Sequence, residues 1–255
     1  MKEPTTETPT GHDPAGVPTP DAANDVDHEH GDVTAGWLRP AVFGAMDGLV
    51  SNFALIAGVV GGTRGDHSSE VVLAGLAGLA AGSFSMAAGE YTSVASQAEY
   101  TAKEIEVERQ EIQENSAAEQ AELARMYVDR GIDRHLAAAV AAQVHADPEL
   151  AVAVHAREEL GVDPDNLPSP VVAAVSSFIS FAIGAFIPVL PYILGATSLL
   201  PALIMSMTGL FACGAIVSSV TTRTWWYGGL RQLVLGGAAA GLTFLIGDLV
   251  GATLG

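Results

Sequence analysis

The sequence predicts an all-α membrane protein with five transmembrane helices and a small helical domain outside the bilayer. Hydrophobic residues make up 49% of the 255-residue chain, yet the formal net charge is −18. One soluble globule would have too little polar surface for this charge, so apolar and acidic residues should occupy different segments. Eight acids fall in residues 1–36, sixteen in residues 98–168 and five elsewhere. The predicted segments are therefore a tail (1–36), helices 1–2 (37–97), the acidic domain (98–168) and helices 3–5 (169–255).

The first segment predicts a disordered acidic tail. Residues 1–36 are rich in Pro, Thr, Asp and Gly and have almost no large apolar side chains. Such a chain cannot bury enough surface to offset the entropy of ordering it. Its histidines, His12, His28 and His30, fit weak metal capture or a plain solvated tail, and the composition favours the tail.

Five apolar runs predict the transmembrane helices. Each is near the ~20 residues that a helix needs to cross a hydrocarbon core of ~30 Å. The alternative, helices buried in a large soluble core, would require a polar shell that the sequence lacks. Abundant Gly, Ala and Ser would let these helices approach closely within a bilayer. The runs are Pro40–Gly62, Val71–Gly89, Pro170–Leu194, Ser198–Val220 and Leu233–Leu254.

Basic residues predict that the N-terminus and residues 98–168 are cytoplasmic and that the C-terminus lies outside. In this orientation only Arg64 flanks the membrane on the outer side. Trp225, Trp226 and Tyr227 then lie at an inner interface, where amphipathic aromatic rings concentrate. The Ala/Gly-rich, Lys-poor composition suggests a bacterial inner membrane. The inner basic residues are Arg39, Lys103, Arg109, Arg223 and Arg231.

The acidic segment predicts three or four short helices, because signals for helix ends recur along it. They are a capping box at Ser116–Glu119 that follows a break near Asn115, a stop at Gly131, N-caps at Asp133 and Asp147, Pro148 at a first helical position and a stop at Gly161.

Four glutamates of this segment have a regular spacing of 3, 8 and 3 residues: Glu108, Glu111, Glu119 and Glu122. In one continuous helix they would fall within an arc of about 80° on one face, and a break at Asn115 would still leave two Glu pairs. Like charges at such spacings destabilise a helix unless something neutralises them, and divalent cations do so. From spacing alone, a solvated acidic face or a docking surface for a protein partner fits as well.

Acids inside apolar runs predict an ion path. An ionised carboxylate there costs at least ~2.5 kcal/mol, so Asp47 and Glu90 should face a cavity or a partner. Met86 lies one turn from Glu90 on the same face. Its thioether beside carboxylates would favour a transition metal, although a Met in a membrane helix more often only packs.

Several classes of function are excluded or disfavoured. Strong acidity argues against a nucleic-acid partner. The single cysteine, Cys213, excludes a disulfide framework and a cysteine zinc site. The chain has neither a Gly-x-Ser-x-Gly nucleophile motif nor a phosphate-binding loop. No Glu is followed by His three residues later, which removes a di-iron carboxylate oxidase. We predict no enzyme and no permanently bound cofactor.

Four motifs in register resemble the vacuolar iron transporter family, from about residue 37 to the C-terminus. They are Phe43–Asn52 (FGAMDGLVSN), Ser85–Val94 (SMAAGEYTSV), Arg157–Gly161 (REELG) and Ile187–Tyr192 (IPVLPY).

The resemblance implies a five-span homodimer in the lipid bilayer that exports Fe²⁺ or Mn²⁺ in exchange for protons. It implies that an ion path runs between the subunits, below a cytoplasmic domain that collects the metal and that can also bind Zn²⁺ or other divalent ions. The resemblance assigns Asp47, Met86 and Glu90 to the path, and Glu108, Glu111, Glu119, Glu122 and Glu159 to the metal-binding domain.

The chain departs from the family pattern at three positions. Pro40 follows Arg39 where an acid is frequent, and Ala156 replaces an acid of some members. His155 stands where Met is common, and its imidazole can still bind a metal. A membrane-anchored metal sensor or buffer, which binds without transport, is the alternative. Asp47 argues against it, because a buffer needs no acid inside the membrane.

Overall fold

A computed structural model describes residues 36–63, 68–219 and 223–254, and within these ranges the only regular structure is helical. The predicted tail with its histidines lies outside the described residues, except for Gly36, and so does Arg64. Within the part of the chain that the structure describes, five helices are long and apolar enough to cross a membrane, which confirms the predicted number and supports an integral membrane protein. They are α1 (Leu38–Thr63), α2 (Ser68–Asp129), α5 (Pro170–Ile193), α6 (Leu199–Ser219) and α7 (Trp225–Leu254).

The ends of α1, α5 and α6 lie within two residues of the predicted ends. Helix α7 begins at Trp225, before the predicted Leu233, because hydropathy marks only the apolar part of a helix. Its first turn carries the aromatic side chains expected at an interface, and the Arg223 guanidinium lies 5.8 Å from the centre of the Tyr227 ring.

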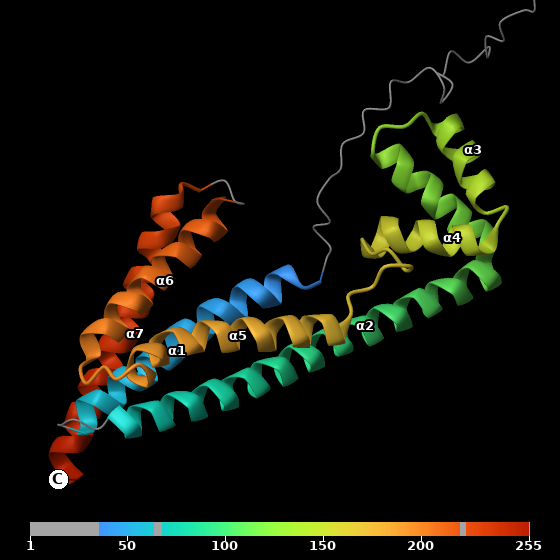
Figure 1. Ribbon diagram of the computed structural model, residues 1–255. Helices are drawn as coiled ribbons and strands as arrows, with labels where there is room; N and C mark the ends of the chain where they lie inside the picture. Colours follow the sequence, from blue (N-terminus) through green and yellow to red (C-terminus); the bar gives the residue numbers. More distant parts are fainter. Residues whose placement is uncertain (1–35, 64–67, 220–222, 255) are drawn as a thin grey trace, which may run out of the picture. The chain divides into compact units, whose positions relative to one another are not determined.

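Helix α2 contains 62 residues and continues far beyond the predicted span (Figure 1). Residues 90–114 include neither Gly nor Pro, so nothing interrupts the helix where the apolar segment gives way to the acidic one. Because α2 runs through residue 97, the structure does not separate the acidic helices as a domain of their own. The backbone leaves helical geometry at Asn115 (φ −131°, ψ 34°), the break predicted from the capping box.

Helix α1 is the most buried of the five spans and packs against α2, α5, α6 and α7. Buried polar groups fasten it, as expected where no water can satisfy them. The Asn52 amide donates to the carbonyl oxygens of Gly75 in α2 (3.1 Å) and Ala185 in α5 (2.6 Å). The Thr243 hydroxyl of α7 donates to the carbonyl of Ala54 (2.8 Å).

Three short helical segments return along the C-terminal part of α2: α3 (Arg134–Val144), α4 (Pro148–His155) and the π-helix η2 (Ala156–Leu160). The predicted caps are confirmed, since Asp133 accepts from two backbone N–H groups of α3 and Asp147 from two of α4. Gly131 (φ 95°) and Gly161 (φ 67°) adopt the left-handed conformation that ends a helix. Ile112, Ala151 and Val152 form a small buried core between α2 and α4.

Candidate metal site

The break at Asn115 brings two distant glutamates of α2 together. In a straight helix Glu108 and Glu119 would lie about 16 Å apart along the axis, at about 1.5 Å per residue. Yet a carboxylate oxygen of each approaches the same atom, Nδ1 of His155, at 2.9 Å for Glu108 and 4.0 Å for Glu119. The second half of α2 therefore folds back, and the two glutamates face one point.

Helix α4 and the π-helix supply the other two side chains. Asp147 and Pro148 begin α4, and His155 is its last residue. Glu159 lies one turn further, in η2, and its Oε1 accepts a hydrogen bond from His155 Nδ1 at 2.8 Å. The His155 side chain is fully buried.

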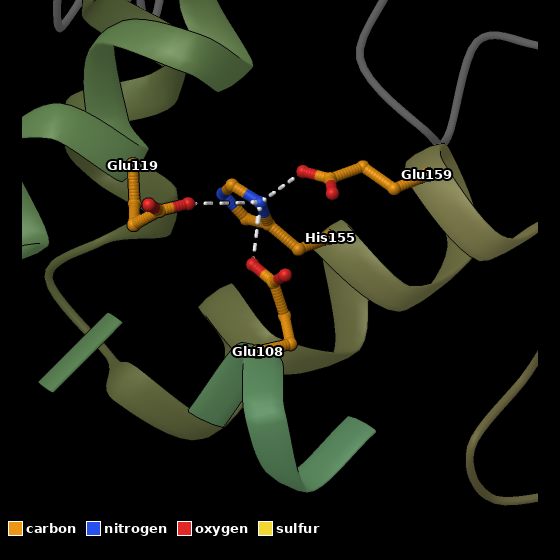
Figure 2. Close-up of side chains that lie close together, drawn as sticks. All are labelled: Glu108, Glu119, His155 and Glu159. Carbon is orange, nitrogen blue, oxygen red and sulfur yellow. Dashed lines mark hydrogen bonds and ion pairs between the residues drawn. The ribbon is translucent and has the colours of Figure 1, made fainter. Parts of the chain in front are cut away.

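These four residues form one cluster, Glu108, Glu119, His155 and Glu159, which we call the EEHE cluster (Figure 2). One ligand atom from each lies within 4.8 Å of those of the other three. Three carboxylates and an imidazole suit a borderline divalent ion such as Fe²⁺, Mn²⁺ or Zn²⁺. The EEHE cluster is therefore suited to hold a divalent metal ion as a transported substrate.

One oxygen of the cluster lacks a hydrogen-bond donor. Nδ1 of His155 has at most one proton, which it donates to Glu159. Oε1 of Glu108 is buried with no hydrogen-bond partner, although it lies 2.9 Å from that nitrogen. A buried carboxylate oxygen without a donor is costly, and a cation at this point would satisfy it.

Burial and like charge raise pKa values in the cluster. The pKa of Glu108 rises to about 7, first because the carboxyl is desolvated and then because Glu159, Glu119 and Glu111 are negative, while His155 opposes the shift. Desolvation is also the main cause that raises the pKa of Glu119. Without an ion, the cluster therefore holds its negative charge poorly near neutral pH.

Ion pairs fasten the returning helices to α2. Arg109 of α2 pairs with Glu149 of α4, and Arg130, just after α2, pairs with Glu158 of the π-helix. All four side chains are at least partly exposed, so each pair contributes about 1 kcal/mol or less. The pairs fix the register of α4 and η2 more than they add stability.

Two predicted ligands lie outside the EEHE cluster. Glu111 and Glu122 are exposed, and the Glu122 carboxylate lies 3.3 Å from Arg125. Glu111 still acts at a distance, because its charge raises the pKa of Glu108. Their role as ligands stays a prediction.

The predicted path residues are half-buried in α1 and α2. Gly48, next to Asp47, packs on the backbone of Phe181 in α5, and Gly82, one turn before Met86, packs on the Phe181 ring. The segments that carry Asp47 and Met86 thus flank one residue of α5. Glu90 follows Met86 on α2 and is likewise half-buried, and the part of all three in transport stays a prediction.

A second histidine, which the sequence does not predict as a site residue, lies beside the EEHE cluster. The rings of His145 and His155 meet edge to face, with centroids 5.2 Å apart. Desolvation lowers the pKa of His145. No motif marks His145 in the sequence, because its position depends on the turn between α3 and α4.

Comparison with known proteins identifies relatives along most of the chain. A family model described as the VIT family matches residues 38–248, which include the predicted path residues and the EEHE cluster. A vacuolar iron transporter of Acanthamoeba castellanii is 35% identical over 85% of this chain and 79% of its own length. Vacuolar iron transporter 1 of Arabidopsis thaliana is 29% identical over 88% of this chain and 90% of its own. Vacuolar iron transporter 1 of rice is 28% identical over 81% and 82%.

Proposed function

The chain belongs to the VIT family, and from this premise we propose that it exports Fe²⁺ and/or Mn²⁺ from the cytoplasm in exchange for protons. The observation that carries the proposal is the EEHE cluster, in which a buried carboxylate oxygen of Glu108 has no hydrogen-bond donor. Relatives named as iron transporters support metal as the cargo. The protein is then a transporter and not an enzyme.

Helix α2 links collection to transport in this proposal. Met86 and Glu90 lie on the apolar part of α2, and Glu108 lies on the same continuous stretch of this helix, before the break at Asn115. At about 1.5 Å per residue, Glu90 and Glu108 are about 27 Å apart along the axis. The cluster would collect the ion outside the bilayer, and Asp47, Met86 and Glu90 would conduct it across.

Carboxylates also account for the exchange of metal for protons in this proposal. An ion that binds an acid with a pKa of about 7 displaces part of a proton near neutral pH, as for Glu108. A carboxylate inside the membrane that alternates between metal and proton would couple the two fluxes. Asp47 is the acid that we propose for this step, because it lies within an apolar span.

The membrane, the orientation and the dimer belong to the proposal as well. Basic residues support cytoplasmic acidic helices and an external C-terminus. The composition supports a bacterial inner membrane, whereas the named relatives are vacuolar proteins of an amoeba and of plants.

Large apolar side chains of α2, such as Leu73 and Phe84, are exposed in the single chain, which supports a second copy or lipid beside this helix.

Flux into proteoliposomes under an imposed pH gradient tests the function. We expect Fe²⁺ or Mn²⁺ uptake that depends on the gradient, and at least a tenfold loss of rate in the double variant Asp47→Ala, Met86→Ala. Leu245→Ala, at an exposed apolar position of α7, is the matched control and should transport normally. Unchanged flux in the double variant would remove these residues from the path.

The same assay separates transport from the alternative function. A membrane-anchored sensor or buffer would bind the ion with a stoichiometric plateau and show no flux down a gradient. Stoichiometric binding to purified protein together with zero flux at every pH gradient would favour that alternative.

A further inference from the structure

His145 has a feature that the proposed transport function does not use. It caps the C-terminal end of α3, and its ring meets the His155 ring edge to face at 5.2 Å. It does not belong to the EEHE cluster, whose ligand atoms lie within 4.8 Å of one another. His145 is thus placed beside the metal ligands rather than among them.

The backbone fixes which nitrogen of His145 carries the proton. Nδ1 of His145 lies 3.0 Å from the carbonyl oxygen of Ala141, one turn earlier. A carbonyl oxygen can only accept, so Nδ1 must donate. In the neutral ring, Nε2 then has a free lone pair, and this atom is buried without a partner.

His155 requires a hydrogen-bond acceptor for its Nε2–H when an ion binds. Its Nδ1 faces the carboxylates of Glu108 and Glu159, so this nitrogen would bind the ion. A neutral imidazole carries a single proton, which must then be on Nε2. That Nε2 is also buried without a partner, and the side chain is 0% exposed, so bulk water does not reach this atom.

We propose that His145 is the positioning residue of the metal site and that its Nε2 accepts a hydrogen bond from Nε2–H of His155 when an ion occupies His155 Nδ1. The inference rests on the proposed function, since it takes the EEHE cluster as the site of the cargo ion. As the ion binds Nδ1 of His155, the proton on that nitrogen leaves with the hydration water that the ion sheds, and Nε2 carries the remaining proton of the ring. Both Nε2 atoms are buried without partners and the two rings already meet edge to face, so the bond requires the rings to reorient against each other and no new contact between helices.

Such a partner has two effects on a metal-binding histidine. It holds the ring in the orientation that directs Nδ1 to the ion, and it makes Nδ1 a stronger donor. Loss of an outer partner of this kind weakens metal affinity by about 10- to 100-fold.

Co²⁺ binding to the full-length protein in detergent tests the proposal, because its visible absorption reports both affinity and ligand geometry. His145→Phe retains an aromatic ring against His155 but has no acceptor. We expect about tenfold or greater loss of Co²⁺ affinity and a changed visible spectrum. His145→Gln restores an acceptor oxygen and should recover most of the affinity. His135→Phe, at an exposed histidine of the same helix, is the matched control.

The outcomes distinguish this inference from the proposed function. If His145→Phe binds Co²⁺ with wild-type affinity and spectrum while Glu108→Gln loses binding, the cluster stands and the role of His145 is refuted. Equal losses in the Phe and Gln variants would also overturn it, because the acceptor would not matter. No binding by the wild type would reject the cluster itself. If the Phe variant does not fold, His145→Leu against His145→Gln makes the same comparison.

Discussion

Glu108 combines a buried position with a pKa raised to about 7, so protons and metal compete for it in the physiological range. A metal ligand must be deprotonated, and below this pKa each unit of pH makes the carboxylate about tenfold scarcer. We predict that Mn²⁺ affinity falls by about tenfold per pH unit below about 7. Calorimetric titration at about pH 7.5, 6.5 and 5.5 measures the slope.

Glu108→Gln provides the comparison for this slope. The variant should bind Mn²⁺ more weakly at high pH and should lose most of the dependence on pH. If the variant keeps the slope of the wild type, the competing proton is not on Glu108.

The same raised pKa predicts how the stability of the metal-free protein changes with pH. An acid whose pKa rises from 4.5 to about 7 on folding stabilises the folded state below 4.5, and this contribution is lost as pH rises through 7. We therefore expect a higher melting temperature at about pH 5.5 than at about pH 7.5. Tryptophan fluorescence recorded during heating measures this temperature. Glu108→Gln should melt higher than the wild type at pH 7.5 and should show a smaller difference between the two pH values.

His145 acts in the opposite sense. Its pKa is lowered from 6.5, so its contribution to stability is lost as pH falls below that value. Both proteins contain His145, so the difference between their pH profiles isolates Glu108. Identical profiles would contradict the assignment.

The ends of the helices could be predicted because neighbouring residues determine them. Asp133 and Asp147 are N-caps and Gly131 and Gly161 are stops because capping and left-handed turns are local properties. The break at Asn115 was predicted in the same way. Its consequence was not, because the direction of the second half of α2 depends on packing against α3 and α4.

The residues of the site show the same limit. Spacing alone treats Glu111 and Glu122 as equivalent to Glu108 and Glu119, yet only the latter two join the EEHE cluster. Glu159 and His155 were predicted only by resemblance to a family, since no spacing relates them to α2. A contact between residues far apart in sequence leaves no local signal.

Helix α2 offers a test of coupling between its two parts. Ala102 is exposed on the stretch between Glu90 and Glu108, where Pro would remove a hydrogen bond and disrupt the helix at a cost of about 3 kcal/mol. We predict that Ala102→Pro keeps Mn²⁺ affinity within a few-fold, because the cluster lies wholly beyond it, but lowers flux at least tenfold. Ala102→Gly, which costs about 1 kcal/mol, is the control and should retain most of the flux. Wild-type flux in the Pro variant would show that a continuous α2 is unnecessary.

Helix α1 holds the membrane-spanning helices together. Its backbone approaches α7 so closely that a Cβ on Gly247 would lie 2.0 Å from the carbonyl oxygen of Gly58 and would collide with it. Such contacts replace the hydrophobic effect, which does not drive helices together inside a bilayer. The apolar pattern predicted the spans, and the glycines set how closely they pack.

The orientation of the chain in the membrane decides the direction of transport, and cysteine labelling tests this orientation. With the acidic helices in the cytoplasm, α5 runs outward and the loop between α5 and α6 lies outside. In a Cys213→Ser background, Thr197→Cys in that loop should react with a membrane-impermeant maleimide in intact cells. Glu114→Cys, on the acidic part of α2, should react only after the cells are permeabilised. Both positions are exposed, so access to the reagent depends on the side of the membrane. Labelling of Glu114→Cys in intact cells would place the EEHE cluster outside, and a cluster there could not collect ions for export.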